Sequence, residues 1–424
     1  MQSLTYRELI SGNRNFRNLL AGQFISELGN WFNFIAGLGL VRFVSDASPT
    51  AAGLFFVARL LPFALMSPIA GTFVDRFSRR TVMIATDLGR SVIALSFLLV
   101  TSPENLWIAY IATILLQTLG AFFDGAKNAA TPNLTGKEGL LAGTALMFST
   151  RFLLMAVGSA LGGWAAAVFG YQVAFVINAA SFLISAYTVW LIPEEAVRER
   201  DTATRRRGDA EKTERASFMT ELREGLRYSV TNHFALTILI MNMIWATGGG
   251  SINIIFERTG GVYFASREGW NPDIAVAMLW TATGFGLTLG MLIAHRTSIY
   301  LDRKNRNRGF IGWTLIIHGI LFSIGGLMPT LWLFAVIVFV SRAIVGVEYA
   351  VQETMFQRSL PDYIRGRIST LDRGAELTVF GLSSYLASGM MFYITPQTLT
   401  FISGLLSALA GVVWFVRQRK VTSD

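Results

Sequence analysis

Charged side chains are concentrated in the segment GTFVDRFSRR, residues 71–80, between two long apolar runs. The charges are those of Asp75, Arg76, Arg79 and Arg80. A weaker copy, SIYLDRKNRNR, places Asp302, Arg303 and Arg306 in the second half of the chain, with Asp302 227 residues after Asp75. A carboxylate beside guanidinium groups can form ion pairs and can face the positive end of a neighbouring helix. The pattern therefore predicts a reversible latch rather than a catalytic centre.

Two acidic residues are candidate partners for this latch. Asp124 lies eight residues before Pro132, and Glu353 lies eight residues before Pro361. We expect Arg79 or Arg80 to pair with Asp124, and Arg303 or Arg306 to pair with Glu353, while Gly71 allows close helix approach. The alternative is that the arginines only anchor loops on one side of a membrane. That alternative does not explain the acids, which contribute little to orientation.

A second set of charges lies inside apolar runs. Glu27, Arg59, Arg151 and Arg342 fall near the middle of their runs, and Glu348 lies about 9 Å beyond Arg342 at 1.5 Å per residue. A lone charge in lipid costs several kcal/mol, so such residues mark functional sites by default.

Glu27 is the first candidate for carrying a proton. Arg59 and Arg151 are expected to be its partners, or to bind an anionic part of a substrate. A static ion pair that holds the first half together is an equal alternative. Glu348 is the second candidate, with Arg342 as a substrate or gate contact.

Polar and aromatic residues in the same runs are candidates for lining a cavity between helices. They are Gln23, Asn30, Trp31, Asn33, Gln117, Asn242 and Trp245. Three consecutive glycines, residues 248–250, fit either a helix break that lines the cavity or close helix packing. His318 is expected to be a hydrogen-bonded packing residue.

The elements that position these residues are long apolar helices. Of the 424 residues, 52% are hydrophobic and only 15% are charged. The chain is predicted to be an all-α membrane protein, since runs of 18 or more apolar residues cross a bilayer as helices. Twelve spans fit: about 16–43, 50–72, 79–101, 104–127, 139–168, 171–192, 233–256, 273–297, 308–328, 331–355, 372–393 and 397–416.

Composition also limits the chemistry. The chain has no cysteine, which excludes disulfides and thiolate sites. It has no nucleotide-binding loop, metal motif or catalytic constellation, so we expect neither an enzyme nor a cofactor or metal site. The segment from Glu257 to Pro272 reads as a long outer loop.

Loop charges predict the orientation and the domains. Arginine and lysine concentrate in one set of loops, which places both termini in the cytoplasm. The net charge of +9 then reflects basic loops beside lipid, not nucleic-acid binding. A polar stretch is predicted to be a linker, partly disordered and partly an amphipathic helix near SFMTELREGLRYSV. The predicted domains are an N-terminal six-helix bundle (1–192), a cytoplasmic linker (193–232) and a C-terminal six-helix bundle (233–424).

Two halves of six spans, a central polar linker and the pattern GxxxDRxxRR at residues 71–80 resemble the major facilitator superfamily. The segments ATPNLTGKEGLLAGTAL, GSALGGW and SLPDYIRGRIS are similar to its bacterial macrolide and siderophore efflux branch. The resemblance implies twelve transmembrane helices in two pseudo-symmetric bundles that expose a central site alternately to each side. It also implies that the predicted latch closes the cytoplasmic side.

The resemblance further implies a monomeric antiporter in the bacterial inner membrane, with a small amphipathic or hydrophobic substrate, protons and membrane lipid as its partners. One motif departs from the family. VGSALGG, residues 157–163, has Ser159 where the antiporter motif has proline, which leaves the helix kink and proton coupling open. The alternatives to efflux are uptake, lipid-type translocation or a non-transporting membrane sensor.

Overall fold

The computed structural model describes residues 4–74, 76–197 and 218–421, and this part of the chain is helical without a strand. The longer helices are α2 (Arg14–Val44), α3 (Pro49–Val74), α4 (Arg79–Leu95), α5 (Leu106–Phe169), α6 (Tyr171–Trp190), α9 (Phe218–Thr231), α10 (His233–Arg258), α12 (Pro272–Lys304), α13 (Asn307–Gly325), α14 (Leu331–Ser359), α15 (Asp362–Met390) and α16 (Pro396–Val421). The short ones are α1 (Tyr6–Gly12), α7 (Glu194–Val197) and α11 (Ala265–Glu268).

Polar side chains fix several helix starts. Asn13, Ser78, Asn232 and Thr330 each accept a hydrogen bond from a backbone N–H in the first turn of α2, α4, α10 and α14. Such caps satisfy donors that have no partner inside the helix. The starts of these helices are therefore set locally by the sequence.

One expected loop between spans is absent from the structure. The sequence predicted separate spans at 104–127 and 139–168, but α5 continues from Leu106 to Phe169. The chain bends at Gly136, whose φ of 65° is a conformation that glycine adopts without strain. A single glycine residue thus replaces the loop, because the residues on both sides of it remain helical.

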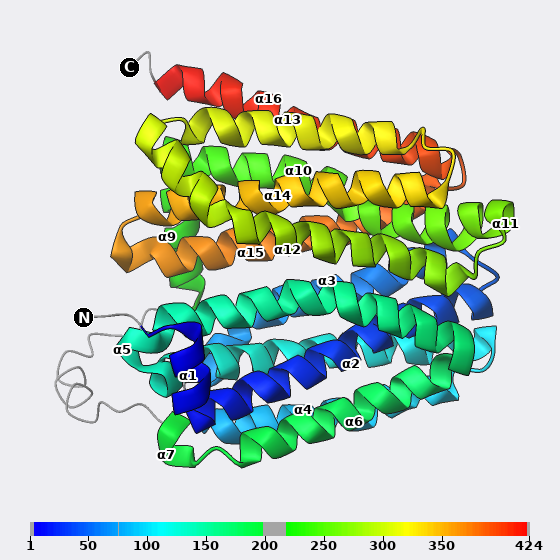
Figure 1. The fold of residues 1–424 in the computed structure, drawn as a ribbon, viewed down its shortest axis with the longest axis horizontal. Helices are drawn as coiled ribbons and strands as arrows, with labels where there is room; N and C mark the ends of the chain where they lie inside the picture. The colour runs from blue at the N-terminus through cyan, green and yellow to red at the C-terminus, as the bar shows by residue number, and fades with distance from the viewer. Residues whose placement is uncertain (1–3, 75, 198–217, 422–424) are drawn as a thin grey trace.

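The helices gather in two groups, and both chain termini lie at the same end of the bundle (Figure 1). Helices α2–α6 pack against one another as the N-terminal group, and α10–α16 pack together as the C-terminal group. The groups meet where α3 lies against α15 and where α5 lies against α12. We call the end with the termini, α7 and α9 the terminal face, and the end with α11 the opposite face (Figure 1).

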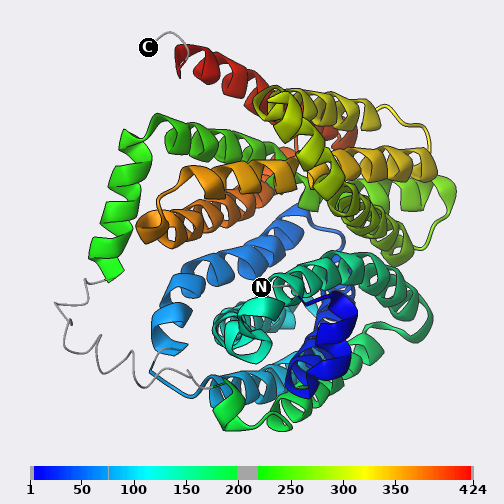
Figure 2. The ribbon, with the colours of Figure 1, turned by 60° about the vertical axis from the view of Figure 1, so that its left-hand side comes forward.

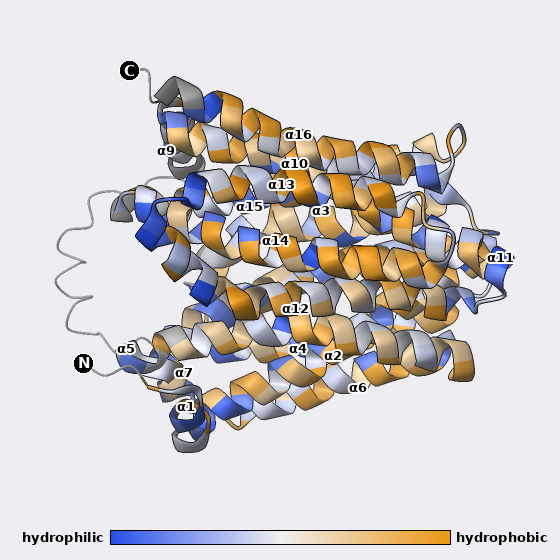
Figure 3. Ribbon diagram, turned by 45° about the horizontal axis from the view of Figure 1, so that its top comes forward, coloured by the Kyte–Doolittle hydropathy of each residue, from blue (hydrophilic) through white to orange (hydrophobic). Residues whose placement is uncertain are grey.

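Ten helical segments of the described chain are long and apolar enough to cross a membrane. Hydrophobic residues cover the middle of the bundle, and hydrophilic ones are frequent toward its two ends (Figure 3). The two other predicted spans, 16–43 and 372–393, coincide with α2 and α15, which are long but not apolar enough to count among the ten. The count of twelve spans therefore stays a prediction.

The predicted outer loop at 257–272 is largely helical instead. Helix α10 continues through a π-helical segment, Thr259–Phe264, into α11. Glu268 at the end of α11 accepts a hydrogen bond from Leu331 N at 3.1 Å, and so caps α14. This contact links α11 to the start of α14.

The turn between α2 and α3 has an uncommon backbone. Asp46 and Ala47 have φ values of 50° and 55°, which residues other than glycine adopt rarely. The turn lies on the opposite face, and its Ala47 carbonyl accepts a hydrogen bond from Arg258 at the end of α10. Backbone strain in the N-terminal group is thus held by a contact with the C-terminal group.

Candidate functional site

A buried ion-pair triad joins the two helix groups at the opposite face. Arg42 of α2 donates through Nη1 to both carboxylate oxygens of Glu257 at 3.0 and 2.9 Å, and through Nη2 to Asp273. Glu257 ends α10 and Asp273 begins α12, so one arginine of the N-terminal group holds two acids of the C-terminal group. All three side chains are at most 9% exposed. Removing one partner of a buried pair is strongly unfavourable, so the triad holds this face closed.

Glycine makes room for the triad. A Cβ atom on Gly261, in the π-helical segment, would lie 2.5 Å from Arg42 Nη1. A Cβ atom on Gly39 would overlap the carboxylate of Asp273 and the ring of Tyr171. The backbones of α2 and of the π-helical segment therefore approach the charged groups as closely as glycine allows.

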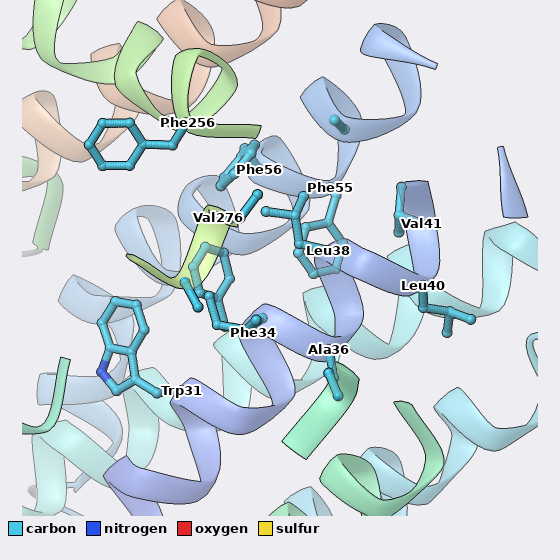
Figure 4. Close-up of a cluster of buried hydrophobic side chains, with 14 of the residues drawn as sticks. Trp31, Phe34, Ala36, Leu38, Leu40, Val41, Phe55, Phe56, Phe256 and Val276 are labelled. Carbon is cyan, nitrogen blue, oxygen red and sulfur yellow. The ribbon is translucent and has the colours of Figure 1, made fainter. Parts of the chain in front are cut away.

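An aromatic cluster packs below the triad, toward the middle of the bundle. Trp280 of α12 lies 5.2 Å from Phe34 and 5.8 Å from Trp31, both of α2, and 5.3 Å from Phe256 of α10, between ring centroids. Figure 4 shows Trp31, Phe34 and Phe256 within this cluster, together with Phe55 and Phe56 of α3. Because its members come from both helix groups, the cluster closes the space between the groups with apolar surface.

The predicted charges of the N-terminal group do come together. Arg59 of α3 stacks on Phe34 at 4.2 Å and interacts electrostatically with Glu27 and Arg151. Glu27 and Arg59 are partly buried, while Arg151 is exposed. The structure therefore places the three side chains near one another, next to the aromatic cluster. Sequence spacing does not connect them, since they come from α2, α3 and α5.

A buried pair in the N-terminal group was missed by the sequence analysis. Arg90 of α4 bonds Asp87, and its guanidinium lies between the rings of Phe123 and Phe182 at 4.5 and 4.4 Å. Asp87 is fully buried and Arg90 is 5% exposed. The pair ties α4 to α5 and α6. Its signal was an acid and a base three residues apart inside an apolar run, a spacing that brings side chains together on a helix.

Two charged residues of α14 are buried without a counter-charge. Arg342 is 5% exposed and Glu348 is 4% exposed. Nε and Nη2 of Arg342 and Oε1 of Glu348 have no hydrogen-bond partner within the described protein. Arg342 lies 5.6 Å from the ring of Phe322, and Ser341 bonds His318 at 2.7 Å, which is the packing role predicted for that histidine. Charges left without a partner in a bundle core suit a site that binds a proton or ligand.

An amide links three helices of the C-terminal group. Asn242 of α10 donates to both carboxylate oxygens of Asp372 of α15 at 3.1 and 2.9 Å, and accepts from Gln352 of α14 at 2.9 Å. The prediction that Asn242 lines a cavity stays a prediction, and the structure shows this side chain bonded to its neighbours. Asp372 is 8% exposed, and its carboxylate accepts hydrogen bonds from an amide rather than pairing with a cation.

The remaining residues predicted to line a cavity differ in burial. Trp31, Gln23 and Asn33 are buried, whereas Asn30, Gln117 and Trp245 are partly exposed. Gln23 Nε2 donates to Met147 O at 3.2 Å, which ties α2 to α5. Gln23 Oε1, Asn33 Oδ1 and Trp245 Nε1 have no hydrogen-bond partner within the described protein. These unpaired polar atoms are available to water or a ligand.

The latch predicted for the terminal face has other partners in this structure. Asp124 bonds Lys127 at 2.6 Å, not Arg79 or Arg80. Arg79 donates to the carbonyls of Ala129 and Val197, and Arg80 donates to that of Trp190. These contacts stay inside the N-terminal group. The expected pairing of Arg79 or Arg80 with Asp124 is wrong for this conformation. Lys127 lies one helical turn from Asp124 and pairs with its carboxylate instead.

The second copy of the latch also pairs within its own group. Asp302 bonds Arg358 at 3.2 Å, and Glu353 accepts from Gln357 at 2.6 Å, rather than pairing with Arg303 or Arg306. Arg76 is exposed, and Asp75 lies outside the described residues. The ion pairs described on the terminal face, Asp124 with Lys127, Asp302 with Arg358 and Arg373 with Glu376, each stay within one helix group.

Gly71 does not mediate a close helix contact here. It is exposed, and a Cβ atom on it would meet nothing within 4 Å. A Cβ atom on Gly53, at the other end of the same helix α3, would instead overlap the Ser388 side chain of α15. On α3, the surface at Gly53 therefore packs on α15, whereas the surface at Gly71 is open. This asymmetry corrects the expected role of Gly71.

Three curated relatives are similar over most of the chain. The uncharacterized MFS-type transporter YfiS of Bacillus subtilis is 23% identical, over 97% of this chain and 95% of its own. Macrolide efflux protein A of Streptococcus pyogenes is 24% identical over 84% of each chain. The putative bacilysin exporter BacE of Bacillus subtilis is 24% identical over 92% of this chain and 91% of its own.

A solved structure shares the fold. A bacterial homologue of the human lysosomal transporter Spinster, in an inward-facing and unoccupied conformation, superposes with a TM-score of 0.70 at 14% identity. The superposition covers 96% of this chain and 97% of that one. The family model of the Major Facilitator Superfamily matches residues 19–369, and with the fold described above this shows that the chain is a multi-pass membrane protein belonging to the Major Facilitator Superfamily of transporters.

Proposed function

We propose that this transporter exports a small amphipathic or hydrophobic molecule from a bacterial cell, in exchange for protons. The proposal places it in the inner membrane as a monomer, with the terminal face in the cytoplasm. The basic loops at that face support this orientation. The names of two relatives, a macrolide efflux protein and a putative bacilysin exporter, support export as the direction of transport.

The observation that carries the proposal is the asymmetry between the two faces. The Arg42–Glu257–Asp273 triad ties the helix groups together at the opposite face. The ion pairs described on the terminal face, Asp124 with Lys127 and Asp302 with Arg358, stay within one group instead. We infer that residues 1–192 and 233–424 act as two rocking domains joined by the linker 193–232, and that this conformation is open to the cytoplasm.

The transport cycle then requires that the triad at the opposite face breaks when the latch residues at the terminal face form contacts between the domains. Outward opening breaks the triad and brings α3 and α15 together near Gly71. Arg76, Arg79, Arg80 and Asp75, with Arg303 and Arg306 in the second half, would then contact the other domain. Each conformation would be favoured by one set of ionic contacts, so a ligand needs only to shift the balance between them.

Proton coupling is assigned to Glu27, with Arg59 and Arg151 as its partners. The electrostatic contact of Glu27 with Arg59 supports this assignment. Loss of a proton strengthens the pairing with arginine, and gain of a proton releases it. Glu348 is the second candidate, because it is buried with one carboxylate oxygen unpaired.

Transport into inside-out proteoliposomes tests the function. Macrolides, peptide antibiotics and cationic dyes are supplied outside, and an acidic lumen provides the proton gradient. We expect accumulation of at least one compound in the lumen, and its loss when the gradient is collapsed. Accumulation only with the opposite gradient or opposite protein orientation would show uptake, and no flux for any compound would favour a sensor.

The Glu27→Gln variant separates coupling from transport. We expect it to abolish accumulation against a gradient but to keep exchange of labelled for unlabelled substrate, because the substrate site remains while the proton site is lost. The matched control is Glu104→Gln, which removes an exposed carboxylate. Gradient-driven accumulation that survives in Glu27→Gln would overturn the assignment of Glu27.

A further inference from the structure

Helix α9 lies across the end of the bundle rather than along it. It crosses the ends of the long helices at the terminal face (Figure 1), and Figure 2 shows it as the bright green helix that leads into α10. A short turn at Asn232, which caps α10, separates the two helices. Since α10 begins a membrane span, α9 lies at the level where the bilayer meets water.

One side of α9 packs on the protein. Gly225 and Ser229 are buried, and Ser229 Oγ bonds Gly225 O at 2.8 Å, so its hydroxyl needs no partner from another helix. The helix contacts α10 and α15. These small residues, one turn apart, allow α9 to lie close to the ends of the two long helices.

The exposed side of α9 changes from apolar to basic to polar around the helix. Leu226 and Val230 are 51% and 58% exposed and lie one turn apart on the apolar edge. Arg223 and Arg227, also exposed and one turn apart, follow next, and Thr231 and the exposed Glu224 lie beyond them. Exposed apolar residues beside arginines are typical of a helix that lies in the interface of a membrane.

We propose that this side of α9 binds the anionic surface of the lipid bilayer. Leu226 and Val230 insert below the headgroups, while Arg223 and Arg227 bind the phosphates of anionic lipids. Charge complementarity favours this occupant, because both arginines lie beside the apolar edge, where an anionic leaflet attracts them, and the acid Glu224 lies on the far side of them. The proposal is independent of substrate and coupling, since it needs only that the chain spans a membrane.

Binding of this kind anchors the start of the C-terminal group. Helix α9 contacts α10 and α15, and α15 is one of the helices that meet the N-terminal group. A leaflet that holds α9 therefore fixes the point about which the terminal ends of α10 and α15 can move. The composition of the lipid would then influence how readily the terminal face opens.

Depth-dependent fluorescence quenching tests the proposal. The chain has no cysteine, so a single cysteine can carry a fluorophore at Val230→Cys or, as the matched control one residue on, at Thr231→Cys. Both variants of the full chain are reconstituted with brominated lipids, in bilayers with and without phosphatidylglycerol. We expect strong quenching at position 230, weak quenching at 231, and a larger difference when phosphatidylglycerol is present.

The arginines are tested in the same assay. Arg223→Gln with Arg227→Gln should lower the ratio of bound to free α9 by about tenfold or more in anionic bilayers. Arg7→Gln with Arg14→Gln removes the same charge from the same face and should leave quenching at position 230 unchanged. A thermal unfolding curve confirms that each variant is folded.

Two results would overturn the proposal. The first is equal quenching at positions 230 and 231, which would mean that α9 does not lie with its apolar edge toward lipid. The second is quenching at position 230 that depends on the ratio of protein to lipid, which would mean that a second copy covers this side of α9. Neither result bears on substrate flux, so the proposed function is tested separately.

Discussion

At the scale of single residues, Arg42 forms the ion pairs that join the two helix groups at the opposite face. One guanidinium satisfies Glu257 and Asp273, and all three side chains are nearly excluded from solvent. The geometry matters as much as the charge, because a planar guanidinium can serve two carboxylates at once and an ammonium cannot do so in the same way. The closed face therefore depends on this residue more than on any neighbouring charge.

Replacing Arg42 tests this dependence. In Arg42→Gln, two buried acids lose their counter-charge, which disfavours the closed arrangement by about 3–5 kcal/mol. Val276 is buried in the cluster below the triad, and a cysteine placed there reports on access from the opposite face. We expect this cysteine to react with an impermeant maleimide, added on the side of the opposite face, more than about tenfold faster in Arg42→Gln than with Arg42 present. Arg267→Gln, an exposed arginine on the same face, is the control. Unchanged labelling in Arg42→Gln would show that packing alone closes the face.

The triad also shows which residues a sequence can reveal. Glu27, Arg59 and Arg151 stood out because a charge in an apolar run is costly wherever it lies. Arg42, Glu257 and Asp273 lie at the ends of their runs, where charges are common and need no explanation. Arg42 is 215 residues from Glu257 in the chain, and no local pattern predicts that the two side chains meet. The pair of Asp87 and Arg90 was detectable from its spacing but was overlooked.

At the scale of elements, helix boundaries followed from local signals, whereas helix junctions did not. Runs of apolar residues predicted most helices, and the amphipathic pattern in the linker predicted the helix that is α9. The continuity of α5 through Gly136 and the π-helical segment after α10 were not predicted. Both depend on tertiary contacts, which decide whether a glycine-containing segment ends a helix or bends it.

The helix contacts themselves can be tested with glycine. A Cβ atom on Gly284 of α12 would overlap the backbone nitrogen of Ala156 in α5, which cannot move aside as a side chain can. We expect Gly284→Ala to disfavour the observed conformation by about 1–3 kcal/mol. Gly71→Ala should leave it unchanged, since that position is open. Thermal unfolding of both variants measures the difference, and equal melting temperatures would contradict the close packing of α5 on α12.

At the scale of the whole molecule, the contacts between the groups are uneven along the bundle. They include ion pairs, aromatic stacking and glycine-mediated packing toward the opposite face, and Gly71 and Gly374 are open toward the terminal face. The sequence predicted two halves and a latch, but it could not predict which latch is closed. That choice depends on a small difference in free energy between two conformations of the same chain.

Distances between spin labels test the rocking motion. Cysteines at Phe43 and Arg267 report on the opposite face, and cysteines at Phe77 and Tyr300 report on the terminal face; all four positions are exposed. With a transported compound bound, we expect the first distance to lengthen and the second to shorten in a fraction of molecules. A compound at 100 times its Kd should also stabilise the protein by about 2.7 kcal/mol. Distances that change together in the same direction would contradict rocking about a central site.

The backbone strain of the turn at Asp46 and Ala47 opposes the closed conformation of the opposite face. Two residues other than glycine in left-handed backbone conformations cost of order 1–3 kcal/mol each, and the bond from Arg258 to the Ala47 carbonyl helps to hold them there. Once that bond and the triad break, the turn can relax, and the torsional energy released partly compensates for the lost ion pairs. The barrier to outward opening is thereby lower than the contacts alone would set it, so Ala47→Gly should make the opposite face open less readily.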